Sequence, residues 1–275
     1  MPYFSIEIIT RGEKTTESVL KSIFDQTFQS FEVVCANSSS YKGVQKVLDQ
    51  YSIRMVDTDP TYGTLGARYE ANLISSGRYS ILLDSTRLLI PEALETIKDV
   101  MGGNDMLAIR EGSIGKGFWF DQIKLHKEIS ESPKNVQKFL KGRSSFIIPR
   151  VYRRDIIREA FKHLREVIPS RYFYTIRHGD HQLVFEESSR HGSNISFYDE
   201  NPLILHFEDT DLSSIFKKYY YYGKSQKLIR GMKGYKVSNI MSYRRSVNFY
   251  DFGKELLCLP IISVRSASFL LGLLL

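Results

Sequence analysis

A single carboxylate follows a segment that is typical of a buried strand. The largely apolar run Tyr79–Leu83 ends at Asp84, which is followed by Ser85 and Thr86. Because open α/β sheets bind ligands beyond the carboxyl ends of their parallel strands, Asp84 is a candidate to hold a divalent metal, Mn²⁺ or Mg²⁺, or a ribose hydroxyl. Thr86 adds no negative charge, so phosphate oxygens and water would complete the coordination of a cation there.

A basic side chain is expected to face the same crevice. Arg68 lies in the predicted helix Leu65–Ser76, which precedes the strand that leads to Asp84. Its planar guanidinium group can donate two parallel hydrogen bonds, either to a phosphate group or to Asp84. The alternative interpretation of Arg68, taken alone, is an ordinary surface ion pair.

The elements that would position these side chains alternate between strand-like and helix-like patterns up to about Asp209. This alternation is typical of βαβ units around a mostly parallel sheet flanked by helices, and so of the α/β class. The predicted strands are Phe4–Thr10, Phe31–Ala36, Ile53–Asp57, Tyr79–Leu83, Met106–Arg110 and Phe146–Pro149. The predicted helices are Thr16–Gln26, Gly43–Tyr51, Leu65–Ser76, Pro91–Val100, Asp155–Glu166, His181–Ser189 and Leu212–Ile229. Glu111–Gly117 is predicted to be a glycine-rich loop, and Tyr172–Ile176 an aromatic strand or loop.

The composition is that of an ordinary globular protein. Of the 275 residues, 42% are hydrophobic and 25% are charged, which excludes an intrinsically disordered chain. The two cysteines, Cys35 and Cys258, lie far apart and offer neither a disulfide framework nor a zinc-ligand spacing, which suits a reducing compartment. The segment Met1–Ile6 lacks the pattern of a signal peptide, so the main body is expected in the cytosol.

The net charge of +7 is concentrated near the C-terminus, where residues 213–254 contain ten Lys and Arg residues and one acid. One interpretation is a nucleic-acid binder that uses Lys217–Arg245, with Tyr219–Tyr222 as stacking groups. The other is a basic surface for anionic lipid. Because the basic stretch directly precedes an apolar segment, the sequence favours a membrane partner over a nucleic acid.

The last part of the chain, Leu256–Leu275, is mostly apolar but contains Pro260 and Arg265. This pattern favours a helix that lies in the membrane interface, and the alternative is a C-terminal helix packed on the core. We therefore predict two domains, residues 1–211 with the α/β pattern and residues 212–275 as a basic, helical, membrane-associated segment.

Short motifs in the first ninety residues occur in a fixed order. They are Ser5–Thr10, Ser22–Thr27, Phe31–Val34, Gly63-x-x-Gly66-Ala67-Arg68, Gly77-x-Tyr79 and Leu82-Leu83-Asp84. Together they resemble the motifs of family 2 glycosyltransferases, well over Ser5–Glu95 and loosely beyond it. The resemblance implies a Rossmann-like GT-A fold and an enzyme that transfers a sugar from a nucleotide-diphosphate sugar.

The resemblance assigns the nucleotide-sugar site to side chains near the ends of strands. The residues implied are Thr10, Arg11, Glu13, Asn37, Arg68 and Asp84. The family usually ends its second strand in two aspartates that read the base, whereas this chain has Ala36-Asn37-Ser38, so the donor can be a UDP- or a GDP-sugar. The family usually has a second aspartate where this chain has Thr86. A catalytically silent domain that binds a nucleotide-sugar or a partner is the alternative.

Inverting members of the family use a carboxylate to deprotonate the acceptor hydroxyl. The similar place in this chain is Arg177–Gln182, so Asp180 is the candidate base, and an ordinary helix cap is the alternative. Trp119 and His206 are predicted on the acceptor side, with a buried tryptophan and a core histidine as the alternatives. The expected acceptor is a lipid-linked or glycan molecule at the cytosolic face of a membrane.

Overall fold

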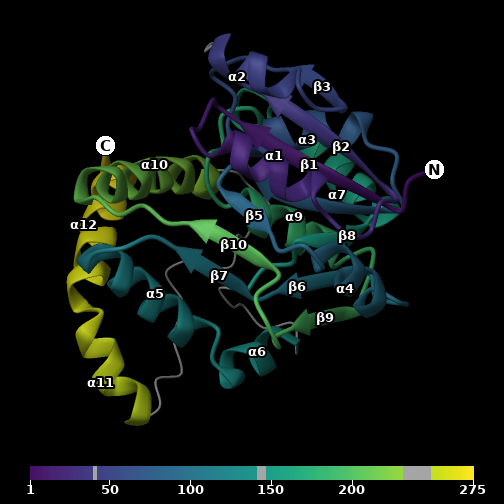
Figure 1. The fold of residues 1–275 in the computed structure, drawn as a ribbon. Coiled ribbons are helices and arrows are strands. Elements are labelled where there is room, and N and C mark those ends of the chain that lie inside the picture. Colours follow the sequence, from purple (N-terminus) through teal and green to yellow (C-terminus); the bar gives the residue numbers. More distant parts are fainter. Residues whose placement is uncertain (40–41, 141–146, 232–248) are drawn as a thin grey trace. The chain divides into compact units, whose positions relative to one another are not determined.

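The computed structural model describes the chain except for residues 40–41, 141–146 and 232–248, and it divides into two compact units (Figure 1). The first unit contains Met1–Gly112 and Pro149–His206. The second contains Ser113–Ile148 and Phe207–Leu275. The second unit therefore includes a middle segment of the chain that the sequence analysis had assigned to the domain of residues 1–211.

The first unit is built on a seven-stranded sheet of order β3-β2-β1-β4-β8-β6-β9 (Figure 1). The strands are β1 (Phe4–Thr10), β2 (Phe31–Asn37), β3 (Ile53–Asp57), β4 (Tyr79–Asp84), β6 (Met106–Ile109), β8 (Val151–Arg153) and β9 (Ile195–Tyr198). Strands β1 to β4 are parallel, and β8 runs antiparallel to β4 and β6. The mostly parallel sheet predicted from the sequence is confirmed.

The register of the parallel strands gathers polar residues at one edge of the sheet. Thr10 pairs with Asn37, and Asn37 pairs with Asp57 on the next strand. On the other side of β1, Ile9 pairs with Asp84. Because the strands run in the same direction, their carboxyl ends bring these side chains together, as ligand sites in open α/β sheets require.

The side chains of β1 alternate between the two faces of the sheet, as the period of a strand dictates. Ile6 and Ile8 are buried in a core that includes Val19 and Leu20 of helix α1 (Thr16–Phe24). Helices α4 (Ala93–Val100) and α2 (Lys42–Leu48) add apolar side chains to the same core. Burial of this apolar surface stabilises one side of the sheet.

The opposite face is covered by α3 (Thr64–Ile74), which contacts β1 and β2. Its Ala67 and Ala71 pack against Val34 and Ala36 of β2. Helices α7 (Arg154–Val167) and α9 (Asp180–Ser188) contact α3 and each other. The N-terminus of α9 therefore lies beside α3, so that a side chain in the first turn of α9 can meet one on α3.

A second sheet has the order β5-β10-β7. Its strands are β5 (Arg87–Leu89), β7 (Glu111–Ile114) and β10 (Ile204–Phe207). The prediction of a loop over Glu111–Gly117 was wrong for its first four residues. The sequence Glu-Gly-Ser-Ile has no clear alternation, and its extended form comes from backbone pairing with a strand far along the chain.

Two further local predictions differ from the structure. A strand was predicted at Phe146–Pro149, but residues 147–149 form none and β8 begins at Val151. Proline has no backbone N–H to donate, and the ladder hydrogen bonds begin at Arg150 instead. The segment predicted as an aromatic strand or loop, Tyr172–Ile176, has its first two residues in the short helix α8 (Ser170–Phe173).

The second unit is mainly helical. Its helices are α5 (Phe118–Ser130), α6 (Pro133–Leu140), α10 (Leu212–Arg230), α11 (Phe249–Leu257) and α12 (Leu259–Leu274). A small core unites Ile123 and Ile129 of α5, Ile215 of α10, and Cys258 and Ile261 near the start of α12. Burial thus explains the apolar residues on one side of the C-terminal helix.

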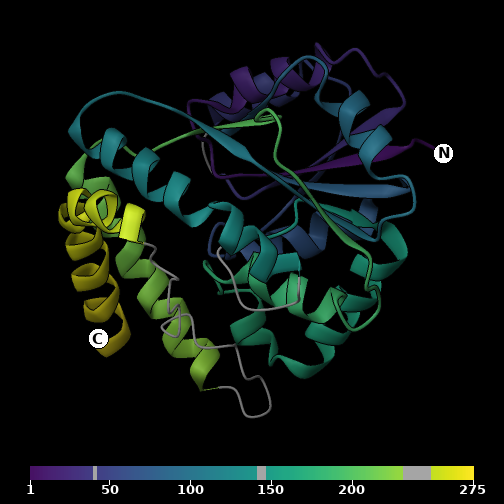
Figure 2. The same ribbon diagram turned by 90° about the horizontal axis from the view of Figure 1, so that it is seen from below.

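Helices α10 and α12 approach closely and lie side by side (Figure 2). Gly223 of α10 faces the backbone of α12, and Gly272 of α12 faces the backbone of α10. A Cβ atom added at Gly272 would lie 1.9 Å from the carbonyl oxygen of Tyr220, so no larger residue fits at this crossing. None of the helices in the described part of the chain is both long and apolar enough to span a membrane.

Candidate active site

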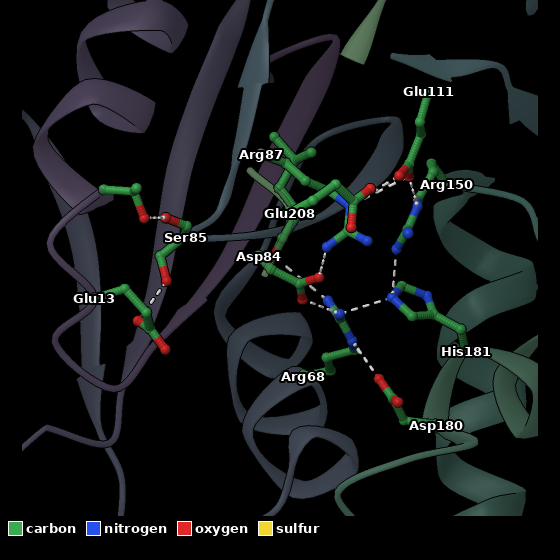
Figure 3. Close-up of polar contacts among 12 residues, drawn as sticks. Glu13, Arg68, Asp84, Ser85, Arg87, Glu111, Arg150, Asp180, His181 and Glu208 are labelled. Carbon is green, nitrogen blue, oxygen red and sulfur yellow. Dashed lines mark hydrogen bonds and ion pairs between the residues drawn. The ribbon is translucent and has the colours of Figure 1, made fainter. Parts of the chain in front are cut away.

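A buried guanidinium group joins two of the predicted site residues (Figure 3). The Nε of Arg68 donates to Oδ2 of Asp180 over 2.7 Å, and its Nη2 donates to Oδ1 of Asp84. The side chain of Arg68 is 2% exposed, that of Asp180 8% and that of Asp84 25%. The structure therefore brings together α3, the end of β4 and the start of α9. The sequence predicted that Arg68 could meet Asp84, whereas it named Asp180 only as a candidate base.

Two further arginines continue this network. The Nη1 of Arg87 donates to the second oxygen of Asp84, and its Nε lies 3.2 Å from both oxygens of Glu111. Arg150 donates from Nε to the same Glu111 over 2.6 Å. Three guanidinium groups and three carboxylates thus alternate in one connected array, to which we refer as the arginine cluster (Figure 3).

His181 closes the arginine cluster from the side of α9. Its Nε2 lies 2.7 Å from Nη2 of Arg68 and also accepts from Nη1 of Arg150. Burial, followed by the charges of Arg68 and Arg150, holds the pKa of His181 well below its usual range. The ring is therefore neutral at physiological pH and acts as an acceptor for two cations, with its proton on Nδ1.

The two aspartates of the arginine cluster are ionised. Burial opposes the charge of Asp84, but Arg68 and Arg87 outweigh it and hold the pKa of the carboxyl well below its usual range. Burial likewise opposes the charge of Asp180, but the positive charge of Arg68 and its hydrogen bond to Oδ2 lower the pKa of the carboxyl nonetheless. Both carboxylates are thus fully charged near neutral pH, where Asp180 can accept a proton.

The predicted contacts after β1 form a separate group. Oε2 of Glu13 accepts from Thr10 Oγ1 and from the backbone N–H of Arg11, each over 2.9 Å. It also accepts from Ser85 Oγ over 2.5 Å, so Ser85 faces Glu13 (Figure 3). Glu13 therefore fixes the loop after β1 against the loop after β4, and its assigned role in nucleotide binding stays a prediction.

Arg11 is exposed and donates from Nη2 to the carbonyl oxygen of Tyr62. Burial and the nearby Arg177 lower the pKa of its guanidinium group. The Tyr62 ring stacks on Tyr174, with 4.4 Å between the ring centroids. Two arginines and a pair of stacked rings thus lie beside the loop after β1, and of these only Arg11 was predicted from the sequence.

Asn37, at the end of β2, is held by a residue that the motifs do not include. Its Nδ2 donates to Oδ1 of Asp57 over 3.1 Å, and its Oδ1 accepts from the backbone N–H of Ser39 over 3.1 Å. Asp57 is the register partner of Asn37 on β3 and supplies a carboxylate beside the position where the family usually has one. The only sequence signal for Asp57 is that it ends a predicted strand.

The two predicted acceptor-side residues belong to different units. Trp119 lies in α5 of the second unit, where it packs against the core that contains Ile123. His206 lies in β10, is mostly buried, and pairs in register with Arg87 of β5. The structure thus places His206 on the strand beside one member of the arginine cluster, and the acceptor role of both residues stays a prediction.

Strand β1 contains a buried carboxyl group, that of Glu7, which contacts α3 one helical turn beyond Arg68. Oε1 of Glu7 accepts from Asn72 Nδ2 over 2.9 Å, and Oε2 has no hydrogen-bond partner among the described residues. Burial raises the pKa of Glu7 to about 7. The polar residue within the apolar strand β1 was not singled out from the sequence.

The raised pKa predicts how stability depends on pH. Between pH 4.5 and about 7 the folded state retains a proton on Glu7 that the unfolded state has lost, so raising the pH destabilises the fold. As the pH is raised from 4.5 to 8, the unfolding free energy of Glu7→Gln should rise by about 1–3 kcal/mol relative to that of the wild type. Urea unfolding at both pH values measures this, with the exposed Glu17→Gln as control. Parallel pH profiles for Glu7→Gln and wild type would show that Glu7 is ionised in the fold.

The sheet, the helices on its two faces and the charged site at the carboxyl ends of its parallel strands define a Rossmann-like α/β protein. The chain belongs to glycosyl transferase family 2, whose family model matches residues 5–161. The family inferred from the motifs around Arg68 and Asp84 is thereby confirmed. A comparison with curated protein sequences found no match.

Several solved structures have a similar fold. S. aureus TarS is 16% identical with a TM-score of 0.55. The match covers 96% of this chain and 49% of TarS, so this chain spans about half the length of TarS. TarS 1–349 from S. aureus, in complex with UDP-GlcNAc, is 15% identical with a TM-score of 0.57. The match covers 97% of this chain and 73% of that one. Mannosyltransferase PcManGT from Pyrobaculum calidifontis, in complex with GDP-Man and Mn²⁺, is 14% identical with a TM-score of 0.54. The match covers 97% of this chain and 74% of that one. These similarities confirm the GT-A fold.

Proposed function

We propose that the protein is an inverting glycosyltransferase that transfers a sugar from a nucleotide-diphosphate sugar to a lipid-linked or glycan acceptor. The observation that carries the proposal is the position of Arg68, which holds the candidate base Asp180 and the strand-end carboxylate Asp84 on two sides of one buried guanidinium group. An acceptor group and a donor group could thus meet across a distance that a single side chain spans.

The geometry supports a single-displacement reaction. Asp180 is ionised, and among the residues that the structure describes it is bound only through Oδ2, by Arg68, so Oδ1 can accept the proton of the acceptor hydroxyl. As that proton leaves, the acceptor oxygen forms a bond to the anomeric carbon. The bond from that carbon to the β-phosphate oxygen breaks, and its electron pair remains on the nucleoside diphosphate. Attack opposite the leaving group inverts the anomeric carbon.

The side chains around Asp84 do not fit the divalent metal that the sequence predicted there. Both oxygens of Asp84 are bound by guanidinium groups, Ser85 faces Glu13, and Thr86 is uncharged. The described residues contain no group of three His, Cys, Asp or Glu side chains that could hold a metal ion. Hard cations prefer several carboxylate and carbonyl oxygens, so no step of the proposed reaction is assigned to a metal.

The base of the donor is proposed to be uracil or guanine. The relatives were solved with UDP-GlcNAc and with GDP-Man, so the family fold accommodates both kinds of donor. Purified protein should be screened for thermal stabilisation by UDP, GDP and their sugars, followed by assay of sugar transfer to lipid-linked acceptors. Stabilisation by a nucleotide-sugar without transfer to any acceptor would favour the silent binding domain. The absence of any stabilisation would contradict the proposal.

We further propose that the second unit attaches the enzyme to the cytosolic face of a membrane. Exposed basic residues line α10, among them Lys217, Lys224 and Lys227. The Nζ of Lys227 donates to the carbonyl oxygen of Leu274 over 3.2 Å, so this basic surface adjoins the exposed leucines at the end of α12. Basic residues beside an apolar surface suit anionic lipid, at about 1 kcal/mol per Lys or Arg.

Vesicle flotation tests this attachment. The double variant Leu257→Ser, Leu274→Ser removes two exposed leucines and should weaken binding to vesicles rich in phosphatidylserine by about tenfold or more. Leu140→Ser, an exposed leucine of α6, is the matched control and should bind as the wild type does. Deleting α12 is a poorer test because the helix packs on α10. Equal flotation of wild type and double variant would contradict the proposal.

A further inference from the structure

Two of the three cations in the arginine cluster are partly accessible to solvent. Arg68 is 2% exposed, whereas the side chains of Arg87 and Arg150 are 12% and 11% exposed. Asp84, at 25%, is the most exposed carboxylate in the cluster. Of the three cations in the cluster, Arg87 and Arg150 are therefore the two that an incoming anion can reach beside Asp84, and Arg68 is the most deeply buried.

The chemistry of these side chains suits a diphosphate. A guanidinium group stays charged at all physiological pH values, and its planar fork donates parallel hydrogen bonds to phosphate oxygens. Each guanidinium group has five N–H donors, so Arg87 and Arg150 can donate to phosphate oxygens as they do to the anionic oxygens of Asp84 and Glu111. The neutral ring of His181 helps to orient Arg150, since a neutral acceptor adds no competing charge.

From this arrangement, and resting on the proposed function, we infer that Arg87 and Arg150 take the place of a divalent cation and bind the diphosphate of the donor directly. As the bond from the anomeric carbon to the β-phosphate oxygen breaks, negative charge grows on that oxygen. Cationic donors fixed at that place stabilise it in the same sense as a metal ion does. Nucleotide binding by this protein is then independent of metal.

Calorimetry tests the inference with UDP and GDP as probes. Each is titrated into the full chain, once in EDTA and once in MnCl₂. The nucleotide that binds should have dissociation constants within about threefold of each other in the two buffers. Arg87→Gln and Arg150→Gln should each weaken its binding in EDTA by about tenfold or more, because each removes a hydrogen bond between charged groups.

The matched control is Arg153→Gln, which removes an arginine of the same unit that is paired with Asp105 over 2.6 Å. It should leave nucleotide affinity unchanged. Thermal unfolding of every variant separates loss of folding from loss of binding. Arg87→Lys keeps the charge without the planar fork and should show an intermediate loss of affinity.

Three outcomes distinguish the inference from the proposed function. Binding in MnCl₂ but not in EDTA, with Mn²⁺ taken up in an electron paramagnetic resonance titration, would overturn the inference and leave the proposed function intact. Folded Arg87→Gln and Arg150→Gln variants with wild-type affinity would also overturn it. If neither nucleotide binds in either buffer, the proposed function itself fails.

Discussion

Asp180→Asn should reduce sugar transfer by about 10²–10⁴-fold, the usual loss when a general base is removed. The amide keeps the size of the side chain and can still accept from Arg68, but it cannot take the proton of the acceptor hydroxyl. Donor affinity should change little, because the base acts in the transition state and not on the bound nucleotide. Steady-state kinetics and calorimetry with the preferred nucleotide measure the two effects separately.

The pH dependence of the wild-type enzyme gives a second measure of the same group. Since the pKa of Asp180 is lowered, the acid limb of the rate profile should lie below about pH 4. The matched control is Asp155→Asn, which also changes an aspartate in the first turn of a helix, but one that pairs with Arg153. It should transfer sugar at a rate within about twofold of the wild type. Full turnover by Asp180→Asn would place the base elsewhere.

Strands β1 to β4 and the helices between them could be predicted because each has a clear local pattern. Apolar runs end at Thr10 and Asp84, and the helices carry apolar residues at helical spacing. Parallel pairing then places these strand ends at one edge without further information. The part of the site that follows from this rule, Asp84 with Arg68 of the preceding helix, was predicted correctly as a neighbouring pair.

The rest of the arginine cluster could not be predicted in the same way. Glu111 lies in β7, which has no strand pattern, and Arg150 follows a proline in a segment whose predicted strand was displaced. Arg87 directly follows the Asp84-Ser85-Thr86 motif, but only the turn into β5 directs it back to Asp84. These contacts join segments that are distant along the chain, so they depend on the tertiary fold and not on local sequence.

The residue at the end of β2 shows a different limit. By the motifs, Asn37 stands where the family usually has aspartates, and its side chain carries no charge. In the structure the neighbouring strand supplies Asp57, whose Oδ1 lies 3.1 Å from Nδ2 of Asn37. A comparison along one strand cannot detect a group contributed by its neighbour, because the register of β2 and β3 decides which side chains meet.

Arg68→Gln should destabilise the fold by about 3–5 kcal/mol, the cost of removing one partner of a buried ion pair. The substitution leaves Asp180 buried without its countercharge and removes one of the two cations bound to Asp84. The control is Arg54→Gln, since Arg54 is half-exposed in its 2.9 Å pair with Glu32 and should contribute less than about 1 kcal/mol. Urea unfolding at pH 7 measures both values.

The pH dependence of this loss separates charge from packing. In the wild type, the lowered pKa values of Asp84 and Asp180 stabilise the fold above the ordinary aspartate pKa of about 4, and this contribution disappears as the pH falls through the folded values. The difference in unfolding free energy between wild type and Arg68→Gln should therefore be largest at pH 7 and become smaller below about pH 4. A difference that stays constant from pH 7 to pH 3 would mean that the Arg68 side chain stabilises the fold by filling space between α3 and α9, and that the two aspartates do not depend on its charge.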